Sequence, residues 1–192
     1  DIIAGNLGEN YKYKASPKTP FELYTTDFDA NGNLDIVLSF YEENKQYPLR
    51  GRECTSNQMP FIKEKFKSYD SFGKAQLEDV YGKEKLSKAL HLKASTFTSM
   101  YLENDGTGQF NPKPLPVEAQ FSTINSIITN DIDGDGNLDI IISGNLYGSE
   151  VETPRADASY GLFLKGNGEG DFKSISPKES RLYVMGDVKS SS

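Results

Sequence analysis

Two nine-residue segments repeat one pattern of Asp, Asn and Gly, and this repeat most limits what the chain can fold into. The sequences are DFDANGNLD at residues 27–35 and DIDGDGNLD at residues 131–139. Each runs directly into a β-branched stretch, IVL at 36–38 and III at 140–142, which is typical of a strand. A shortened third copy opens the chain, because residues 1–6 (DIIAGN) read like the strand after the second copy. We therefore predict repeated units of strand, loop and strand.

Oxygen-bearing side chains occupy positions 1, 3, 5 and 9 of both loops, with Gly at position 6 and Asn at position 7. Alternate positions of a tight turn face the same way, so these oxygens can meet on one ion, joined by the carbonyl of position 7. Because every ligand is a hard oxygen, the favoured ion is Ca²⁺. The predicted ligands are Asp27, Asp29, Asn31, Asn33 and Asp35 for a first Ca²⁺ site, and Asp131, Asp133, Asp135, Asn137 and Asp139 for a second.

Charge count predicts different affinities for the two loops. The first carries three carboxylates, with the neutral Asn31 at position 5, whereas the second carries four, with Asp135 at that position. Because ligand charge is one determinant of calcium affinity, we expect the second loop to bind more tightly. Asp131→Ala should then cost more calcium-dependent stability than Asp27→Ala.

Two other interpretations of the loops must be weighed. An EF-hand needs a Glu at position 12, where this chain has Leu38 and Ile142, and it needs flanking helices rather than strands. A plain Asp/Asn/Gly turn that hydrogen-bonds to its own backbone is the second alternative. Identical spacing in two loops, and the repulsion among three or four carboxylates without a cation, favour ion binding.

A hairpin signature also repeats. The segments YLENDGTGQF at 101–110 and LFLKGNGEGDF at 162–172 alternate and then enter Gly- and Asn-rich turns. Between the first loop and the hairpin at 101–110, the spacing of the apolar residues changes from every second residue to a helical period. Pro60 lies near a first turn, and Ile62, Phe66 and Tyr69 form an apolar stripe. We predict a second helix capped by Ser71, carrying Ala75, Leu77, Val80 and Tyr81 and ending at Gly82, and a third over Lys83 to Leu90.

These patterns divide the chain into four parts. Units of this kind bury both faces by stacking, as blades around an axis or turns of a solenoid. We predict the end of a truncated blade at 1–18, a blade at 19–111 with a helical insertion at about 56–95, a second blade at 112–180, and the first strand of a following blade at 181–192. The fold class is mainly β: a partial β-propeller of about two complete blades plus flanking strands.

Composition excludes several classes of partner. The formal net charge is −7 and the lysines are scattered, so nucleic acid is not expected as a partner. The apolar runs are far shorter than the roughly 20 residues of a membrane helix, so we expect no membrane span. The single cysteine, Cys54, cannot form an internal disulfide and gives no indication of the compartment. The first residues lack the features of a signal peptide and read as the interior of a repeat.

The loops and the hairpins that end at Phe110 and Phe172 resemble the FG-GAP or VCBS-type propeller repeats of integrin α-subunit heads and bacterial surface proteins. The likeness covers roughly residues 1–41 and 96–189. The segment RGREC at 50–54, the helical stretch and residues 114–121 are similar to a bacterial, Bacteroidetes-like branch with a UnbV-type association. The Phe-Gly and Gly-Ala-Pro signatures of integrin repeats are missing. The resemblance implies a propeller of seven blades when complete, with its ions between the first two strands of a blade.

Two classes of function remain. The leading one is a non-catalytic binding or adhesion module, extracellular or at the cell surface of a bacterial envelope, in which calcium stabilises blades that meet a protein or glycan ligand. Its partners would include the remaining blades of the same protein or a partner chain. The alternative is a propeller-scaffold enzyme, a lyase or hydrolase using an Arg/acid face.

The enzyme alternative depends on a few residues. Arg50, Arg52 and Arg155 are candidates for an acidic ligand, although pairing with the many carboxylates is the simpler interpretation. His91 is interpreted as a packing or surface residue at a helix end, and Cys54 as a buried or incidental thiol despite its neighbouring arginines. The tyrosines at 11, 13, 24, 41 and 47 suit sugar stacking or, more simply, packing between strands.

Overall fold

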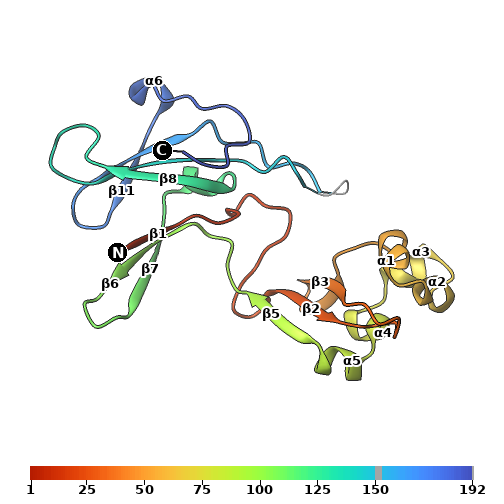
Figure 1. Cartoon of the computed structure of the whole chain (residues 1–192). Helices are drawn as coiled ribbons and strands as arrows, with labels where there is room; N and C mark the ends of the chain where they lie inside the picture. The colour runs from red at the N-terminus through yellow and green to blue at the C-terminus, as the bar shows by residue number, and fades with distance from the viewer. Residues whose placement is uncertain (150–152, 192) are drawn as a thin grey trace. The chain divides into compact units, whose positions relative to one another are not determined.

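The computed structural model describes residues 1–149 and 153–191, and it is mainly β, with three antiparallel sheets and a few short helices (Figure 1). The chain divides into two compact units, one of Asp1–Lys12 with Phe97–Ser192 and one of Tyr13–Thr96. We call them the outer unit and the inserted unit, because the second interrupts the first in sequence. Among the described residues, no helix is long and apolar enough to cross a membrane.

The outer unit contains two sheets. One is three-stranded in the order β1-β6-β7, with β1 at Ile2–Ala4, β6 at Met100–Asn104 and β7 at Phe110–Pro114. The other is four-stranded in the order β11-β10-β9-β8, with β8 at Ile124–Asn130, β9 at Asp139–Gly144, β10 at Leu162–Gly166 and β11 at Phe172–Ile175. A 3₁₀ helix, η1 at Val117–Gln120, precedes β8, and a short helix, α6 at Pro177–Ser180, follows β11.

One buried cluster joins the two sheets of the outer unit. Tyr101 from β6 packs with residues of β9 and β10, and its ring meets the ring of Phe172 edge to face at 5.6 Å between centroids. Gly170 is needed here, because a Cβ at this position would lie 2.7 Å from the Tyr101 ring, and its φ is +80°. The cluster consists of Tyr101, Leu115, Ala119, Ile124, Ile140, Ile142, Leu162 and Leu164.

The inserted unit has one sheet and five short helices. The sheet order is β4-β3-β2-β5, with β2 at Phe21–Thr26, β3 at Asp35–Glu42, β4 at Lys45–Pro48 and β5 at Leu90–Ala94. Between β4 and β5 lie α1 at Arg52–Gln58, α2 at Phe61–Lys65, α3 at Tyr69–Gly73, α4 at Leu77–Tyr81 and α5 at Lys83–Lys88. Its core joins Tyr24, Phe28 and Val37 to the apolar residues of the helices.

The helical segment differs in detail from the prediction. It begins at Arg52 rather than near residue 56, and Leu90 belongs to β5 rather than to a helix. The second predicted helix is divided in two, and Ser71 lies inside the first part instead of capping it. The Ser68 side chain accepts the Ser71 N–H at 3.1 Å and caps α3, which ends at Gly73, whereas α4 follows the cap residue Gln76. Gly82, with φ of +83°, ends α4 as predicted.

Strand pairing also changes the predicted boundaries. The hairpin β6-β7 was placed in a blade over 19–111, but β6 pairs with β1 in the register Ile2↔Leu102. Residues 13–96 thus form their own unit inside the connection from β1 to β6, and the hairpin belongs to the sheet that β1 begins. Residues 181–191, predicted as a strand, contain none. This segment is held by single hydrogen bonds, such as Val184 N–H to the Tyr160 carbonyl at 2.7 Å.

We expect the inserted unit to fold when residues 13–96 are expressed alone. Its buried apolar cluster is made wholly of its own residues, and all four strands of its sheet find their partners inside it. The measurement is the amide spectrum of the excised unit, whose dispersed resonances should overlay those of the intact chain. Collapse of the excised unit into unfolded resonances would contradict its independence.

Candidate metal centres

Each loop connects two neighbouring antiparallel strands of its sheet, the two central strands in the inserted unit and an edge strand and its neighbour in the outer unit. The first connects β2 to β3 and the second connects β8 to β9, and each is closed by an equivalent residue pair, Thr26↔Asp35 and Asn130↔Asp139. In each loop three carboxylates approach one another, with one oxygen of each within 4.8 Å of the others. The two groups are Asp27, Asp29 and Asp35, and Asp131, Asp133 and Asp139. Each group can hold a metal ion.

The backbone of the two loops is organised by the same hydrogen bonds. The position-1 carboxylate accepts the N–H of the position-6 glycine, at 2.8 Å in the first loop and 3.0 Å in the second. It also accepts the N–H of position 5, at 3.1 Å in both. The position-5 side-chain oxygen in turn accepts the N–H of position 7. The repeated sequence therefore gives a repeated structure, in which the carboxylates have backbone partners and face inward.

Position 9 anchors each loop to its sheet. Asp35 and Asp139 are buried, with 3% and 0% of their surface exposed, and each accepts the N–H of position 2, at 2.8 Å from Phe28 and 3.0 Å from Ile132. The other oxygen has a different partner in each loop. Asp139 accepts the Gly166 N–H from β10 at 2.9 Å, and Asp35 accepts the Gln58 side-chain amide from α1 at 3.1 Å.

Two positions of each loop have left-handed backbone. At position 6 Gly32 and Gly136 have φ of +88° and +90°, as expected for the place where the loop reverses. At position 4 Gly134 has φ of +78°, but the first loop has Ala30 there, at +61°. Because a Cβ strains this conformation, the first loop carries backbone strain at Ala30, whereas the second loop has a glycine there and avoids it.

The loops stabilise the charged form of their carboxylates. Hydrogen bonds from backbone N–H groups, that of Gly32 first, hold the pKa of the Asp27 carboxyl below its usual range. The Lys165 ammonium does the same for Asp135, and the carboxylates of Asp133 and Asp135 in turn raise the pKa of Lys165. Asp27 and Asp135 are therefore held in the ionised state, which is the state that binds a cation.

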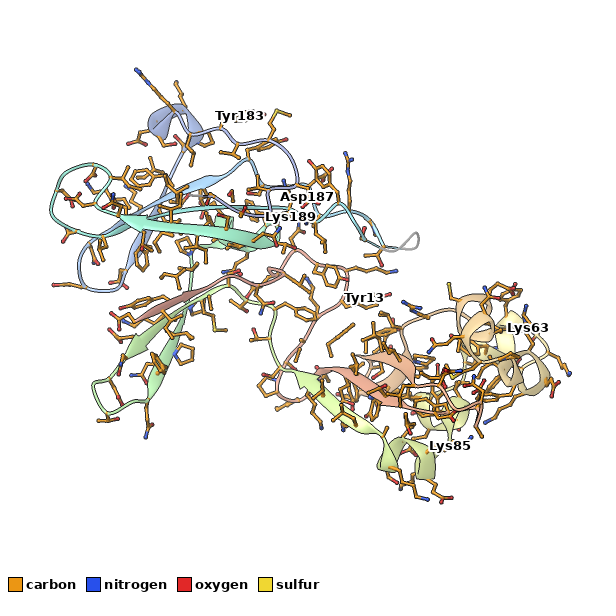
Figure 2. All side chains as sticks on the ribbon, in the orientation of Figure 1. Tyr13, Lys63, Lys85, Tyr183, Asp187 and Lys189 are labelled. Atoms are coloured by element: carbon orange, nitrogen blue, oxygen red, sulfur yellow. The ribbon has the colours of Figure 1, made fainter. Side chains whose placement is uncertain are left out.

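Lys165 is the main feature that the sequence reasoning missed. It lies on β10, and its ammonium forms ion pairs with Asp133 and, at 2.8 Å, with Asp135. Asp135 thus faces a lysine rather than joining the three grouped carboxylates of its loop. A signal was present, because Lys165 lies on the strand that pairs with the strand following the loop. Lys85 of α5, labelled in Figure 2, was also missed. It donates to the Phe28 carbonyl in the first loop at 2.6 Å.

Comparisons of the chain with protein-family models, with curated proteins and with solved structures found no match. The assignment of the loops therefore rests on the chain itself.

The residues considered for catalysis lie apart from the loops and have structural partners. Arg52 donates to the Phe66 carbonyl at 2.6 Å and covers the Tyr69 ring, while Arg155 pairs with Asp157 at 2.9 Å and covers the Tyr147 ring. Cys54 is exposed on α1, which excludes the buried thiol of the two expected alternatives, a buried or an incidental one.

His91 lies in a polar cluster on β2 and β5, rather than at a helix end. Its ring stacks on Tyr24 with centroids 4.1 Å apart, and its Nε2 atom is 3.1 Å from the carboxylate of Glu22. Glu22 is 2% exposed and also accepts the Tyr24 hydroxyl at 2.6 Å. These contacts tie β5 to β2 and give His91 a packing role, as expected of a lone histidine.

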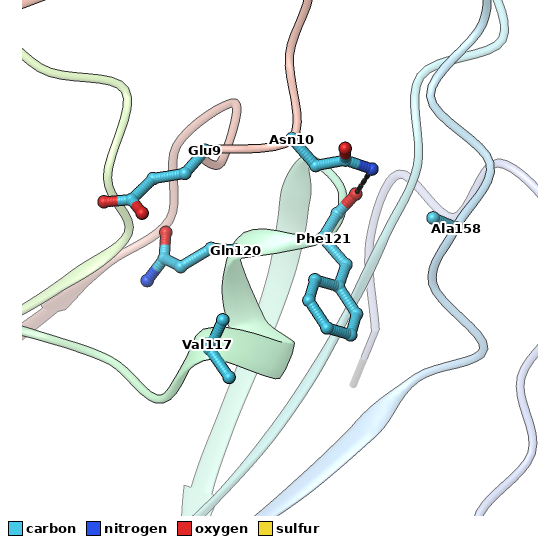
Figure 3. Close-up of a pocket in the computed structure, with 6 residues that line it drawn as sticks. All are labelled: Glu9, Asn10, Val117, Gln120, Phe121 and Ala158. Atoms are coloured by element: carbon cyan, nitrogen blue, oxygen red, sulfur yellow. Dashed lines mark hydrogen bonds between the residues drawn. The ribbon is translucent and has the colours of Figure 1, made fainter.

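The outer unit also carries an open hollow of about 450 Å³ near η1 (Figure 3). Phe121 and Val117, 44% and 63% exposed, form its apolar part, and Glu9 and Asn10 its polar part. The Asn10 side-chain amide donates to the Phe121 carbonyl at 3.2 Å. A second hollow adjoins it, sharing Asn10, Phe121 and Ala158. Together they form a shallow surface with aromatic and amide groups.

Proposed function

We propose that this chain is a calcium-stabilised part of a β-propeller, of the FG-GAP or VCBS type, in an extracellular or cell-surface protein, where it serves as a non-catalytic module that binds protein or glycan. The observation that carries the proposal is the equivalence of the two loops. They share spacing, hydrogen bonds, the buried position-9 carboxylate and the place between two antiparallel strands.

Calcium fits the donor set of both loops. All the grouped ligands are carboxylates, and backbone N–H groups already orient them, so an ion would find its ligands organised. The oxygens of Asn31 and Asp135, and the carbonyls of Asn33 and Asn137, are proposed to complete the two sites. Loops of this kind in extracellular modules have dissociation constants of about 10⁻⁴ to 10⁻³ M, which suits the calcium concentration outside cells.

The propeller part of the proposal rests on the two sheets of the outer unit. The sheet of β8 to β11 is a four-stranded antiparallel meander, as a blade is, and the sheet of β1, β6 and β7 packs on it through one core. Within the described residues β1 pairs with β6 alone, so a strand from the remaining blades or from a partner chain can complete this sheet. The ligand surface would include the shallow hollows around Phe121.

The enzyme alternative gains no support from Arg52 and Arg155. It needs arginines that converge with acids outside the loops, whereas Arg52 and Arg155 are engaged in local packing at separate places in the chain. We therefore propose binding rather than catalysis.

Calcium should stabilise the folded chain and bind with a stoichiometry of two. At a concentration ten times its dissociation constant, an ion that binds the folded state alone adds about 1.4 kcal/mol to the free energy of unfolding of the unit that holds it. Calorimetric titration gives the stoichiometry, and thermal unfolding with calcium or with a chelator gives the stabilisation.

Asp131→Asn and Asp105→Asn form a matched pair for this test. Asp131 holds position 1 of the second loop, whereas Asp105 is an exposed aspartate in the β6-β7 turn, where its carboxylate accepts the N–H and hydroxyl of Thr107. The first change should remove one binding event and the second should leave both. Absence of calcium heat at millimolar concentration, or equal losses in the two variants, would overturn the proposed function.

A further inference from the structure

Lys165 differs from the other ion-paired lysines of the helices and strands described. Each of the others contacts one acid. Lys74 and Lys88 pair with acids one helical turn away, Lys63 pairs with Glu53 on a neighbouring helix, and Lys93 and Lys113 pair with acids on neighbouring strands. Lys165 instead reaches from β10 to a loop about 30 residues earlier, where its ammonium contacts two carboxylates, Asp133 and Asp135. Both carboxylates are proposed calcium ligands. The loop therefore already holds a cation, supplied by the protein itself.

The first loop has no such lysine. Among the described residues, no Lys or Arg nitrogen lies within ion-pair distance of Asp27, Asp29 or Asp35, and position 5 is the neutral Asn31. The extra carboxylate of the second loop, Asp135, thus occurs together with the lysine that pairs with it. Counting only the cations that pair with carboxylates, the first loop has a formal charge of −3 from three carboxylates, and the second has the same charge from four carboxylates and Lys165. Lys85 contacts the Phe28 carbonyl of the first loop and none of its carboxylates.

We propose that Lys165 competes with calcium for the second loop and reverses the order of affinities that charge count alone predicts, so that the first loop binds calcium more tightly. The inference rests on the proposed calcium sites. An ion at Asp133 and Asp135 must displace the ammonium or lie beside a like charge, and both cost binding free energy. The Lys165 side chain is 39% exposed, so it can swing into solvent when the ion enters.

Because of this competition, the two loops would bind calcium over different ranges of calcium concentration. The first loop would fill at lower concentration, and the second would keep its acidic loop paired with Lys165 until calcium rises further. Because Asp139 of the second loop accepts the Gly166 N–H, and Gly166 follows Lys165 on β10, the exchange of cations takes place at the junction of the loop with its sheet.

The test compares Lys165→Met with Lys173→Met in the intact chain. Lys173 is the matched control, because it lies directly opposite Lys165 in the β10-β11 register and forms no ion pair with a described carboxylate. Both changes remove one positive charge from the same sheet. The amide resonances of Gly32 and Gly136 report the two loops separately, since each donates to the position-1 carboxylate of its own loop. Calcium chloride is titrated to about 10 mM, beyond the range of extracellular sites.

In the unaltered chain Gly32 should shift at lower calcium concentration than Gly136. Lys165→Met should lower the calcium midpoint of Gly136 at least about tenfold, with little change at Gly32. Lys173→Met should lower it less than about threefold, because Lys173 forms no ion pair with the loop carboxylates. A response of Gly136 that appears only in Lys165→Met also supports the inference.

Two results would overturn the inference while leaving the proposed function intact: Gly136 responding before Gly32 in the unaltered chain, or equal midpoints of Gly136 in the two lysine variants. No response of either glycine in any of the chains would overturn the proposed function and the inference together.

Discussion

Asn145→Ala is expected to lower the free energy of unfolding of the outer unit by about 3 to 5 kcal/mol, because this side chain connects three separate segments. Asn145 is 2% exposed and directly follows β9. Its side-chain oxygen accepts the Ser122 hydroxyl at 2.8 Å and the Ser159 N–H at 3.1 Å. Its side-chain amide donates to the carbonyls of Ser159 and Gly186, both at 2.9 Å. Alanine would leave these groups unpaired.

The backbone of Asn145 adds to the expected loss. Its φ is +92°, a conformation that Asn tolerates better than Ala, which costs about 1 kcal/mol more there. Asn145→Gly separates the two effects, since it relieves the backbone while still removing the hydrogen bonds.

Hydrogen exchange in denaturant, read on peptides from each unit, measures the free energy of unfolding of the two units separately. Peptides from 13–96 serve as an internal reference that should not change. A loss below about 1 kcal/mol in the outer unit, or an equal loss in both units, would show that Asn145 does not hold these segments.

The loops and turns were the most predictable parts of this molecule, because their conformation is set by local chemistry. Asp at position 1 and Gly at position 6 specify a turn in which backbone N–H groups meet a carboxylate, and the structure contains that turn twice. The β6-β7 and β10-β11 hairpins follow equally from the Gly-rich runs between their strands. The mainly β fold follows from these elements.

The nesting of one unit inside the other could not be predicted in this way. β1 pairs with β6 across about 100 residues, and nothing local in Ile2–Ala4 tells which hairpin will complete its sheet. The long interval between the two loops signalled extra sequence, but helical spacing marked only its middle part. β5 was hidden for a related reason: Leu90 continues the apolar spacing of α5, although it pairs with Thr25 of β2.

The charge around the second loop could not be counted from the loop sequence alone, because it also depends on strand pairing. The number of carboxylates in a loop is visible in the sequence, whereas the lysine that approaches them comes from another strand. Lys165 and Asp135 become neighbours only through the pairing of β9 with β10, in which Ile140 lies opposite Leu164. Under the proposed calcium binding, affinity in such loops would therefore depend on the sheet as well as on the loop sequence.

Asp139→Ala is expected to destabilise the outer unit by about 2 to 4 kcal/mol without calcium, and to abolish calcium binding in the second loop. Asp139 is fully buried and has two roles that no neighbour can take over. Its oxygens accept the N–H of Ile132 in the loop and of Gly166 in β10, which joins the loop to two strands. Alanine leaves the buried Gly166 N–H without a partner and removes one of the three grouped carboxylates.

Asp139→Asn is the informative companion, because its single carbonyl oxygen can accept one of the two N–H groups while its amide nitrogen faces the other. We expect about half the loss of stability of the alanine variant, together with much weaker calcium binding at this loop. Asp105→Ala, at an exposed turn in the same unit, should change stability by no more than about 0.5 kcal/mol and leave calcium binding intact. Chemical denaturation with and without calcium measures both effects. If Asp139→Ala and Asp105→Ala lowered the free energy of unfolding equally in the presence of a chelator, the Asp139 carboxylate would not connect the loop to its sheet. The proposed second calcium site would then lack a fixed position-9 ligand.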